Sequence, residues 1–192
     1  ELLDRGKPAG LVAIARDRRF RDEIPAVIRP DLVLTDDGFT IAEIDSVPGG
    51  IGLTGWLGRV YAAEGEDILG GADGMLEGFA SVFPGGDIVV SEEAATYRPE
   101  MEWLAERLNE PGPELVPDGR EAPLWQVVDD APRADWQANV YRFFELFDLA
   151  NVRCAPQLAE LAREGRVHVT PPFKPQLEEK LWFALFWLRR AA

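Results

Sequence analysis

Four residues near the start of the chain have side chains of the kinds that bind metal ions and phosphate groups: Arg29, Asp31, Glu43 and Asp45. A turn of the Asp-Gly hairpin type at residues 36–38 lies about midway between Asp31 and Glu43, so these two are expected to be cross-strand neighbours. Glu43 and Asp45 are two positions apart and should point to one face. Three carboxylates this close repel one another unless a cation lies among them, and Mg²⁺ prefers oxygen ligands that it shares with phosphates. The spacing predicts a magnesium site beside which Arg29 could contact a phosphate.

The other candidate ligand contacts are two glycines and a lysine. Gly49 and Gly50 allow the backbone to come close to a ligand, but no Lys-Ser or Lys-Thr pair follows, so a P-loop is rejected. Lys180 could contact a nucleotide, although a lysine on an amphipathic helix is commonly solvated. The carboxylates of the hairpin could likewise be solvated on its outer face, and spacing alone leaves both alternatives open.

The elements that must position these residues alternate along the chain. The expected strands are 11–15, 31–34, 39–44, 87–91, 114–116, 139–144 and 167–170. The expected helices are 56–63, 72–82, 97–108, 156–164 and a last one from about 175, with a loop at 46–55 and a polar surface crossing at 118–136. This alternation predicts an α/β fold, with a Rossmann-like parallel sheet that has helices on both faces.

Another group of polar residues ends one of these strands. Tyr141, Arg142 and Glu145 lie at the carboxyl end of the strand at 139–144, the edge at which open parallel sheets bind ligands. They could contact a ligand there. Alternatively, Arg142 and Glu145 could form a surface ion pair that contributes little stability.

Composition restricts the class of protein. The 192 residues include 20 Lys and Arg and 34 Asp and Glu, for a formal net charge of −14. Such a surface repels nucleic-acid phosphates, so we expect no nucleic-acid partner. No apolar run reaches the roughly 18 residues of a membrane span, and no signal peptide opens the chain. We therefore expect no membrane partner and a soluble, cytoplasmic protein.

The single cysteine and the single histidine exclude further kinds of site. Cys154 has no second thiol for an intrachain disulfide or a thiolate metal cage, and it is expected to be a packing residue. A His-rich zinc site or a Ser–His–Asp triad would need His168. Because His168 lies in the apolar run at 167–170, we expect it to be a structural strand residue.

The segment from Arg29 to Gly50 resembles a known family. The pattern Arg-x-Asp, about a dozen residues, then Glu-x-Asp and a following Pro-Gly is similar to the last strands of ATP-grasp enzymes such as the D-alanine–D-alanine ligases. The resemblance implies that Asp31, Glu43 and Asp45 hold magnesium ions and that Arg29 meets the terminal phosphate of ATP. Asp45 stands where the family usually has Asn, which adds a negative charge and leaves the number of metal ions open.

The order of the segments resembles the circularly permuted branch of that family, which includes the glutathionylspermidine synthetases. The segment 141–145 is similar to its Tyr-Arg strand end, and 165–172 and 177–182 are similar to its strand and lysine-bearing helix. The resemblance implies a permuted C-terminal portion of an ATP-grasp domain at 1–85 and a Rossmann-like pre-ATP-grasp domain at 86–175. It also implies that 176–192 begins the helix leading into the other ATP-grasp half.

The resemblance implies a function as well. We expect a fragment of an ATP-dependent carboxylate–amine ligase that activates a carboxylate as an acyl phosphate, uses Mg-ATP, and acts on a small-molecule or peptide substrate. The fragment is expected to be inactive alone. The alternative is a non-catalytic scaffold or interaction module that retains the fold.

The last helix has more large apolar residues than one core-facing stripe can use. They run from Leu181 to Leu188 and include Trp182, Phe186 and Trp187. We expect this surface to be exposed or covered by a second copy of the chain, which would give a homo-oligomer through the C-terminal helix.

Overall fold

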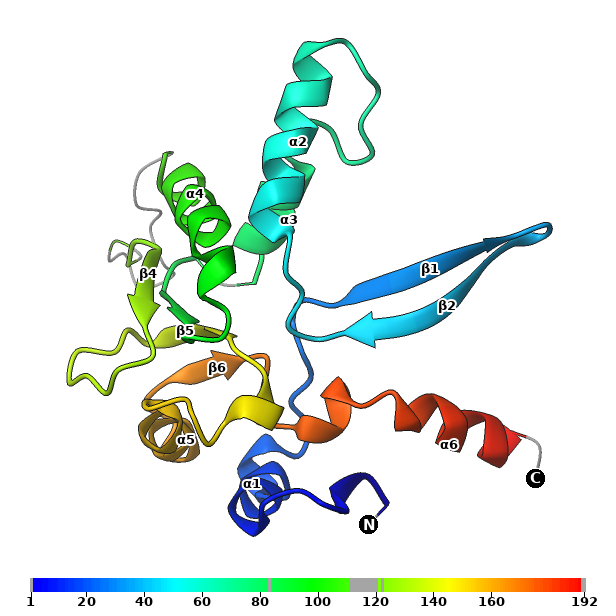
Figure 1. Ribbon diagram of the computed structural model, residues 1–192. Coiled ribbons are helices and arrows are strands. Elements are labelled where there is room, and N and C mark those ends of the chain that lie inside the picture. The colour runs from blue at the N-terminus through cyan, green and yellow to red at the C-terminus, as the bar shows by residue number, and fades with distance from the viewer. Residues whose placement is uncertain (1, 83, 111–120, 122, 191–192) are drawn as a thin grey trace.

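A four-stranded parallel sheet lies at the centre of the computed structural model, which describes residues 2–82, 84–110, 121 and 123–190 (Figure 1). Its strands stand in the order β4-β3-β5-β6. Every neighbouring pair is parallel, which confirms the predicted parallel sheet. The strands are β3 (Asp87–Val90), β4 (Gln126–Asp129), β5 (Asn139–Phe143) and β6 (His168–Thr170).

Helices cover both faces of this sheet, as predicted. On one face lie α2 (Ile51–Ala63), α3 (Gly74–Ala80) and α4 (Arg98–Asn109); on the other lie α1 (Ala9–Ala15) and α5 (Ala155–Arg163). Because successive strand residues point to opposite faces, Ile88 and Val90 pack in the core with α3 and α4. Val89 packs in the core with α5.

Two elements extend from the body of the protein on the same side (Figure 1). One is the antiparallel hairpin of β1 (Arg29–Thr35) and β2 (Gly38–Asp45), and the other is α6 (Leu181–Arg190). All of β1 is exposed, and α6 contains no buried residue. The expected exposure of the C-terminal helix is therefore confirmed, with Phe186, Trp187 and Leu188 all more than half exposed.

Short 3₁₀ helices connect these elements. They are η1 (Leu2–Asp4), η2 (Arg18–Phe20), η3 (Ala95–Tyr97), η4 (Leu146–Asp148) and η5 (Pro175–Glu178). The last helix that we expected from about residue 175 is thus divided into η5 and α6.

One predicted strand is wrong. Residues 11–15 form part of helix α1, in which the amide of Val12 donates to the carbonyl of Pro8 at 3.1 Å. Leu11 and Ala15, which are one helical turn apart, are both buried. A short apolar run fits a buried strand and a helix equally well, and packing of this face against the core decides the outcome here.

Two predicted irregular segments also contain regular structure. The loop expected at 46–55 ends at Ile51, where α2 begins. Strand β4 lies inside the segment 118–136 that we expected to cross the surface. Because β4 is an edge strand with both its ends exposed, its sequence is more polar than that of a central strand. The strand predicted at 114–116 lies outside the described residues.

The two hydrophobic cores include residues from both sides of the predicted boundary at residues 85–86. Leu11 and Phe20 pack with α5, and Leu76 and Phe79 pack with β3 and β5. Cys154 is buried in the first of these cores, as expected, and burial raises the pKa of its thiol to about 12. His168 begins β6 as predicted. No helix in the described part of the chain is long and apolar enough to cross a membrane.

Candidate functional site

The β1–β2 hairpin brings the predicted metal ligands into register. Asp31 lies opposite Glu43 and Arg29 opposite Asp45, which confirms the expected cross-strand pair. The register shifts between Leu32 and Asp31, because Ala42 is an extra residue in β2. Without this bulge Asp31 would face Ala42, so the bulge is what aligns the two carboxylates.

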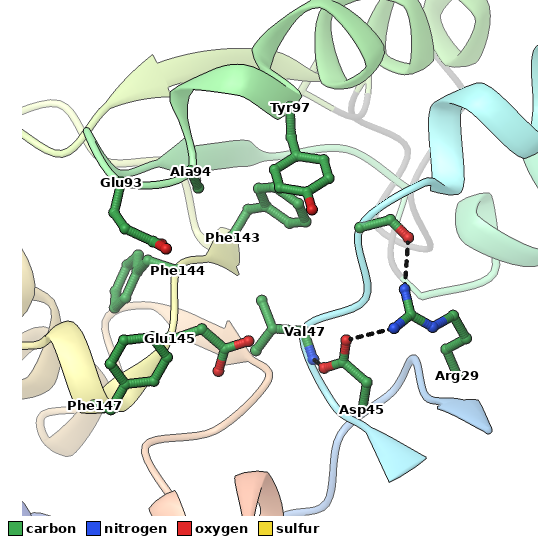
Figure 2. Close-up of a pocket in the computed structure, with 11 residues that line it drawn as sticks. Arg29, Asp45, Val47, Glu93, Ala94, Tyr97, Phe143, Phe144, Glu145 and Phe147 are labelled. Atoms are coloured by element: carbon green, nitrogen blue, oxygen red, sulfur yellow. Dashed lines mark hydrogen bonds and ion pairs between the residues drawn. The ribbon is translucent and has the colours of Figure 1, made fainter. Parts of the chain in front are cut away.

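Arg29 lies at the base of the hairpin and holds several of its groups together (Figure 2). Its Nε lies 3.2 Å from Asp31 Oδ1, and its Nη2 lies 3.3 Å from Asp45 Oδ2. Its Nη1 donates to the Gly49 carbonyl oxygen at 3.1 Å. Asp45 in turn accepts a 2.8 Å hydrogen bond from the Val47 amide. The guanidinium is half-exposed, so solvent or a ligand can reach it.

Glu43 contacts a cation from a distant part of the chain. Lys180, which precedes α6, places Nζ 2.8 Å from Glu43 Oε2. The hydrogen bond to Glu43 and the negative charges of Glu43 and Asp31 raise the pKa of Lys180 above its ordinary value. The structure thus brings Lys180 to the predicted metal edge, although its side chain is 71% exposed.

The donors of this edge suit Mg²⁺ in kind, because all three are carboxylates. Their present arrangement does not gather them. Within the ranges that the structure describes, no three His, Cys, Asp or Glu residues form a group that could hold a metal ion. Asp31 and Asp45 contact Arg29 while Glu43 contacts Lys180, so these ion pairs would have to open before the carboxylates could share a cation.

The two candidate glycines have different surroundings. Gly49 lies beside the ring of Tyr97, where an added Cβ would be only 2.6 Å from a ring carbon. Gly50 has a left-handed backbone (φ 83°) and precedes α2. Its amide donates to Glu100 Oε1 at 2.8 Å, and the Leu53 amide donates to Glu100 Oε2 at 3.0 Å. Glu100 therefore occupies the helix N-terminus that a phosphate would otherwise approach.

A cavity of about 260 Å³ opens between the hairpin base and the carboxyl ends of β3 and β5. The hairpin contributes Arg29, Asp45 and Gly49 to its wall. The segment after β3 contributes Glu93 and Tyr97, and β5 with the segment after it contributes Phe143, Phe144, Glu145 and Phe147. Figure 2 shows the carboxyl groups of Glu93 and Glu145 reaching toward the same open space.

The strand order explains why this edge is hollow. From β3 the chain leads to β4 on one side, and from β5 it leads to β6 on the opposite side. The connections that leave β3 and β5 therefore diverge, which leaves a crevice at the carboxyl ends of these two adjacent strands. Ligands of open α/β sheets bind at such a point, so position and cavity together mark this edge as the candidate site.

Glu145 has the most perturbed carboxyl group of the cavity wall. Its pKa is raised to about 8, first by burial, and then by the negative charge of Glu178 and a hydrogen bond to that side chain. The charge of Asp45 adds to this effect and Arg142 opposes it. Glu145 is therefore largely protonated at neutral pH, a property that is common in functional clefts.

Tyr141 and Arg142, which precede Glu145, lie inside the protein. Both are fully buried. Arg142 donates from Nε to the Pro171 carbonyl at 3.0 Å, and from Nη2 to Glu178 Oε1 at 2.6 Å. The surface ion pair with Glu145 that the sequence allowed is therefore wrong: Arg142 ties η5 to the sheet. Of the three residues, Glu145 alone lines the cavity.

The chain matches no protein-family model, and it has no match among curated proteins or solved structures.

Sequence reasoning missed the part of the wall that follows β3. Glu93 and Tyr97 come a few residues after a predicted strand, at the edge where parallel sheets bind ligands. That position was the available signal. Phe147 follows β5, which lies next to β3 in the sheet, and it is 79% exposed despite being aromatic.

Proposed function

We propose that this chain carries the phosphate-contacting edge of an ATP-dependent carboxylate–amine ligase. The observation that carries the proposal is the position of Arg29. It lies beside the carboxylate pair Asp31–Glu43 and on the wall of the cavity at the carboxyl edge of the sheet. A guanidinium with two neighbouring carboxylates is the donor and acceptor set that a Mg-phosphate group requires.

The residues have separate roles in this proposal. Arg29 donates to the terminal phosphate, and Asp31, Glu43 and Asp45 offer the oxygens that would hold magnesium. When bound, magnesium neutralises negative charge on the transferred phosphoryl group. Lys180 is the second cation of this edge and could exchange Glu43 for a phosphate oxygen. Gly49 keeps the backbone close to the cavity because it has no side chain.

The electrostatics support a nucleotide that arrives with its cation. The chain has a net charge of −14, so a free triphosphate is repelled. Arg29 is the one cation among the described residues that line the cavity. A single guanidinium binds a triphosphate weakly, so we expect Mg-ATP to bind with a dissociation constant of about 1 mM. We expect no ATP hydrolysis by this chain. The carboxylate and the amine would be small molecules or peptides.

Nuclear magnetic resonance titration of the chain with Mg-ATP tests the proposal. We expect shifts centred on the Arg29 side chain and the Gly49 amide, and no such shifts with ATP in the absence of magnesium. Arg29→Ala should weaken binding by about tenfold, because a charge-assisted hydrogen bond is lost.

Arg166→Ala is the matched control, since Arg166 is also exposed and contacts a single carboxylate, Glu164, at 3.4 Å. The proposal fails if Mg-ATP causes no localised shifts, or if Arg166→Ala weakens binding as much as Arg29→Ala.

The alternative is a non-catalytic scaffold, and one observation favours it. Each charged group of the proposed edge already has a protein partner, Arg29 with Asp31 and Asp45, and Lys180 with Glu43. An edge neutralised in this way is stable without a ligand. Absence of Mg-ATP binding together with an intact fold would support the scaffold.

A further inference from the structure

The cavity between the hairpin and the sheet edge has acidic and aromatic walls. Phe143 and Phe144 are buried and form its floor, whereas Tyr97 is 46% exposed and Phe147 79% exposed. The rings of Tyr97 and Phe147 are therefore accessible to a ligand. Aromatic faces attract organic cations through the negative potential of the ring, and they also bury alkyl groups.

The charges of the wall point to a cation as well. Asp45 is paired with Arg29 at 3.3 Å. Glu93 has no ion-pair partner among the described residues, although its carboxyl group reaches into the open space (Figure 2). Glu145 faces the same space and is kept protonated by burial and by Glu178. A positive group beside Glu93 would supply the counter-charge that Glu93 lacks, and the neutral Glu145 would not oppose it.

The size of the cavity limits the ligand. About 260 Å³ is slightly less than the volume of sites that enclose drug-sized ligands. The space fits the head group of a molecule rather than the whole of a large one. An ammonium group on a short alkyl chain matches both the volume and the mixture of carboxyl and ring surfaces.

We propose that this cavity binds the alkylammonium group of an organic amine, with Glu93 as its counter-ion and Tyr97 and Phe147 against its alkyl carbons. Arg29 lines the same cavity from the hairpin side, so the ammonium group is held near the phosphate edge. The role of this amine as the acceptor of the ligase reaction rests on the proposed function. The binding of an alkylammonium ion is a separate claim that stands without that function.

The test compares n-butylammonium with 1-butanol, its neutral analogue, in titrations followed by nuclear magnetic resonance. We expect n-butylammonium to bind with a dissociation constant of about 1 mM and to shift the signals of Glu93, Tyr97 and Phe147. We expect 1-butanol to bind at least tenfold more weakly. Equal affinities would overturn the proposal, because the cavity would then recognise only the alkyl chain.

Variants of two adjacent residues distinguish binding in this cavity from nonspecific attraction of a cation to an acidic protein. Glu93→Gln should weaken n-butylammonium binding about tenfold, because it removes the counter-ion and keeps the shape. Glu92→Gln is the matched control, since Glu92 is exposed, is the neighbouring residue and does not line the cavity. An equal loss in both variants would overturn the proposal.

Phe147→Leu tests the aromatic contribution without disturbing the core. We expect a loss of about threefold, because leucine offers the alkyl carbons a smaller apolar surface and has no ring face for the nearby positive charge. No loss would remove Phe147 from the site.

Arg29→Ala allows the Mg-ATP proposal and the alkylammonium proposal to be tested independently. In this variant Mg-ATP binding should weaken about tenfold, while the affinity for n-butylammonium should stay close to that of the parent chain. If n-butylammonium binds the parent chain but Mg-ATP does not, the ligase function fails and the ammonium site stands. If Mg-ATP binds but n-butylammonium does not, the ammonium site is overturned and the phosphate edge stands.

Discussion

Glu145 and Glu178 show how neighbouring carboxyl groups acquire different properties. Glu178 accepts hydrogen bonds from Arg142 Nη2 at 2.6 Å and from the Leu146 amide at 2.8 Å, so its charge is well compensated. Glu145 is half-buried beside this negative charge, and its pKa rises from 4.5 to about 8. Glu145 therefore keeps its proton at neutral pH, because a second negative charge next to the Glu178 side chain is unfavourable.

This difference predicts how stability depends on pH. Folded Glu145 binds its proton more tightly than unfolded Glu145. This proton therefore makes its full contribution to the stability of the fold below pH 4.5, and the contribution is lost as the pH rises through about 8. Glu145→Gln imitates the neutral form. We expect its Tm to fall less than that of the parent between pH 5 and pH 9, and to exceed the parent Tm at pH 9.

Thermal unfolding followed by circular dichroism measures this effect. Glu106→Gln, on the exposed side of α4, is the control and should have the pH profile of the parent. Parallel profiles of the parent and of Glu145→Gln would contradict the raised pKa.

At the scale of the elements, α4 fixes where α2 begins. The Glu100 side chain of α4 accepts hydrogen bonds from the amides of Gly50 and Leu53, at the N-terminus of α2. The two helices also approach closely at Gly52, where an added Cβ would lie only 2.1 Å from the Glu100 carbonyl oxygen. A carboxylate at a helix N-terminus satisfies free amides and interacts favourably with the helix dipole.

Loss of this cap should destabilise the protein. We expect Glu100→Ala to lower the free energy of unfolding by about 1–2 kcal/mol, because two helix amides lose their acceptor. Urea denaturation measures this change. Glu102→Ala on the same helix removes an exposed residue and should cost less than about 0.5 kcal/mol. A similar loss in both variants would show that Glu100 has no special role.

At the scale of the whole molecule, the hairpin and α6 leave large apolar surfaces exposed on the same side (Figure 1). On the hairpin, Leu34 is 84% and Phe39 63% exposed; on α6, Trp187 is 60% and Leu188 69% exposed. Each large apolar side chain that stays in water forgoes roughly 1.5–3 kcal/mol of burial. Surfaces of this kind favour association.

We therefore predict that the chain self-associates through α6 as its concentration rises. Trp187→Glu should shift the species toward monomer, because it places a charge in the apolar contact. Because each copy carries a net charge of −14, added salt should strengthen the association by screening the repulsion between copies. Sedimentation velocity measures both effects.

Leu69→Glu is the control for this experiment, since Leu69 is fully exposed and lies outside the hairpin and α6. The prediction is wrong if the parent stays monomeric at high concentration. It is also wrong if Leu69→Glu dissociates the complex as readily as Trp187→Glu.

Local sequence signals predicted several parts of this protein. Three signals need no help from the rest of the chain. The turn before Gly38 and the glycine at position 165 each mark the end of an element, and the apolar run at 88–90 marks a buried strand. The alternation of elements predicted the parallel sheet, and the spacing around the turn predicted the Asp31–Glu43 pair. These features depend on backbone propensity and on the period of apolar residues, which are properties of short segments.

Contacts between distant segments decided the rest. The bulge at Ala42 aligns Asp31 with Glu43, Lys180 reaches Glu43 from the far end of the chain, and Arg142 turns inward to Glu178 rather than outward to Glu145. The cavity itself exists because the connections after β3 and β5 diverge. A sequence lists residue types and spacings along one chain, but the charge that surrounds a side chain depends on which segments fold against it. The composition of the candidate site was therefore decided by the tertiary structure.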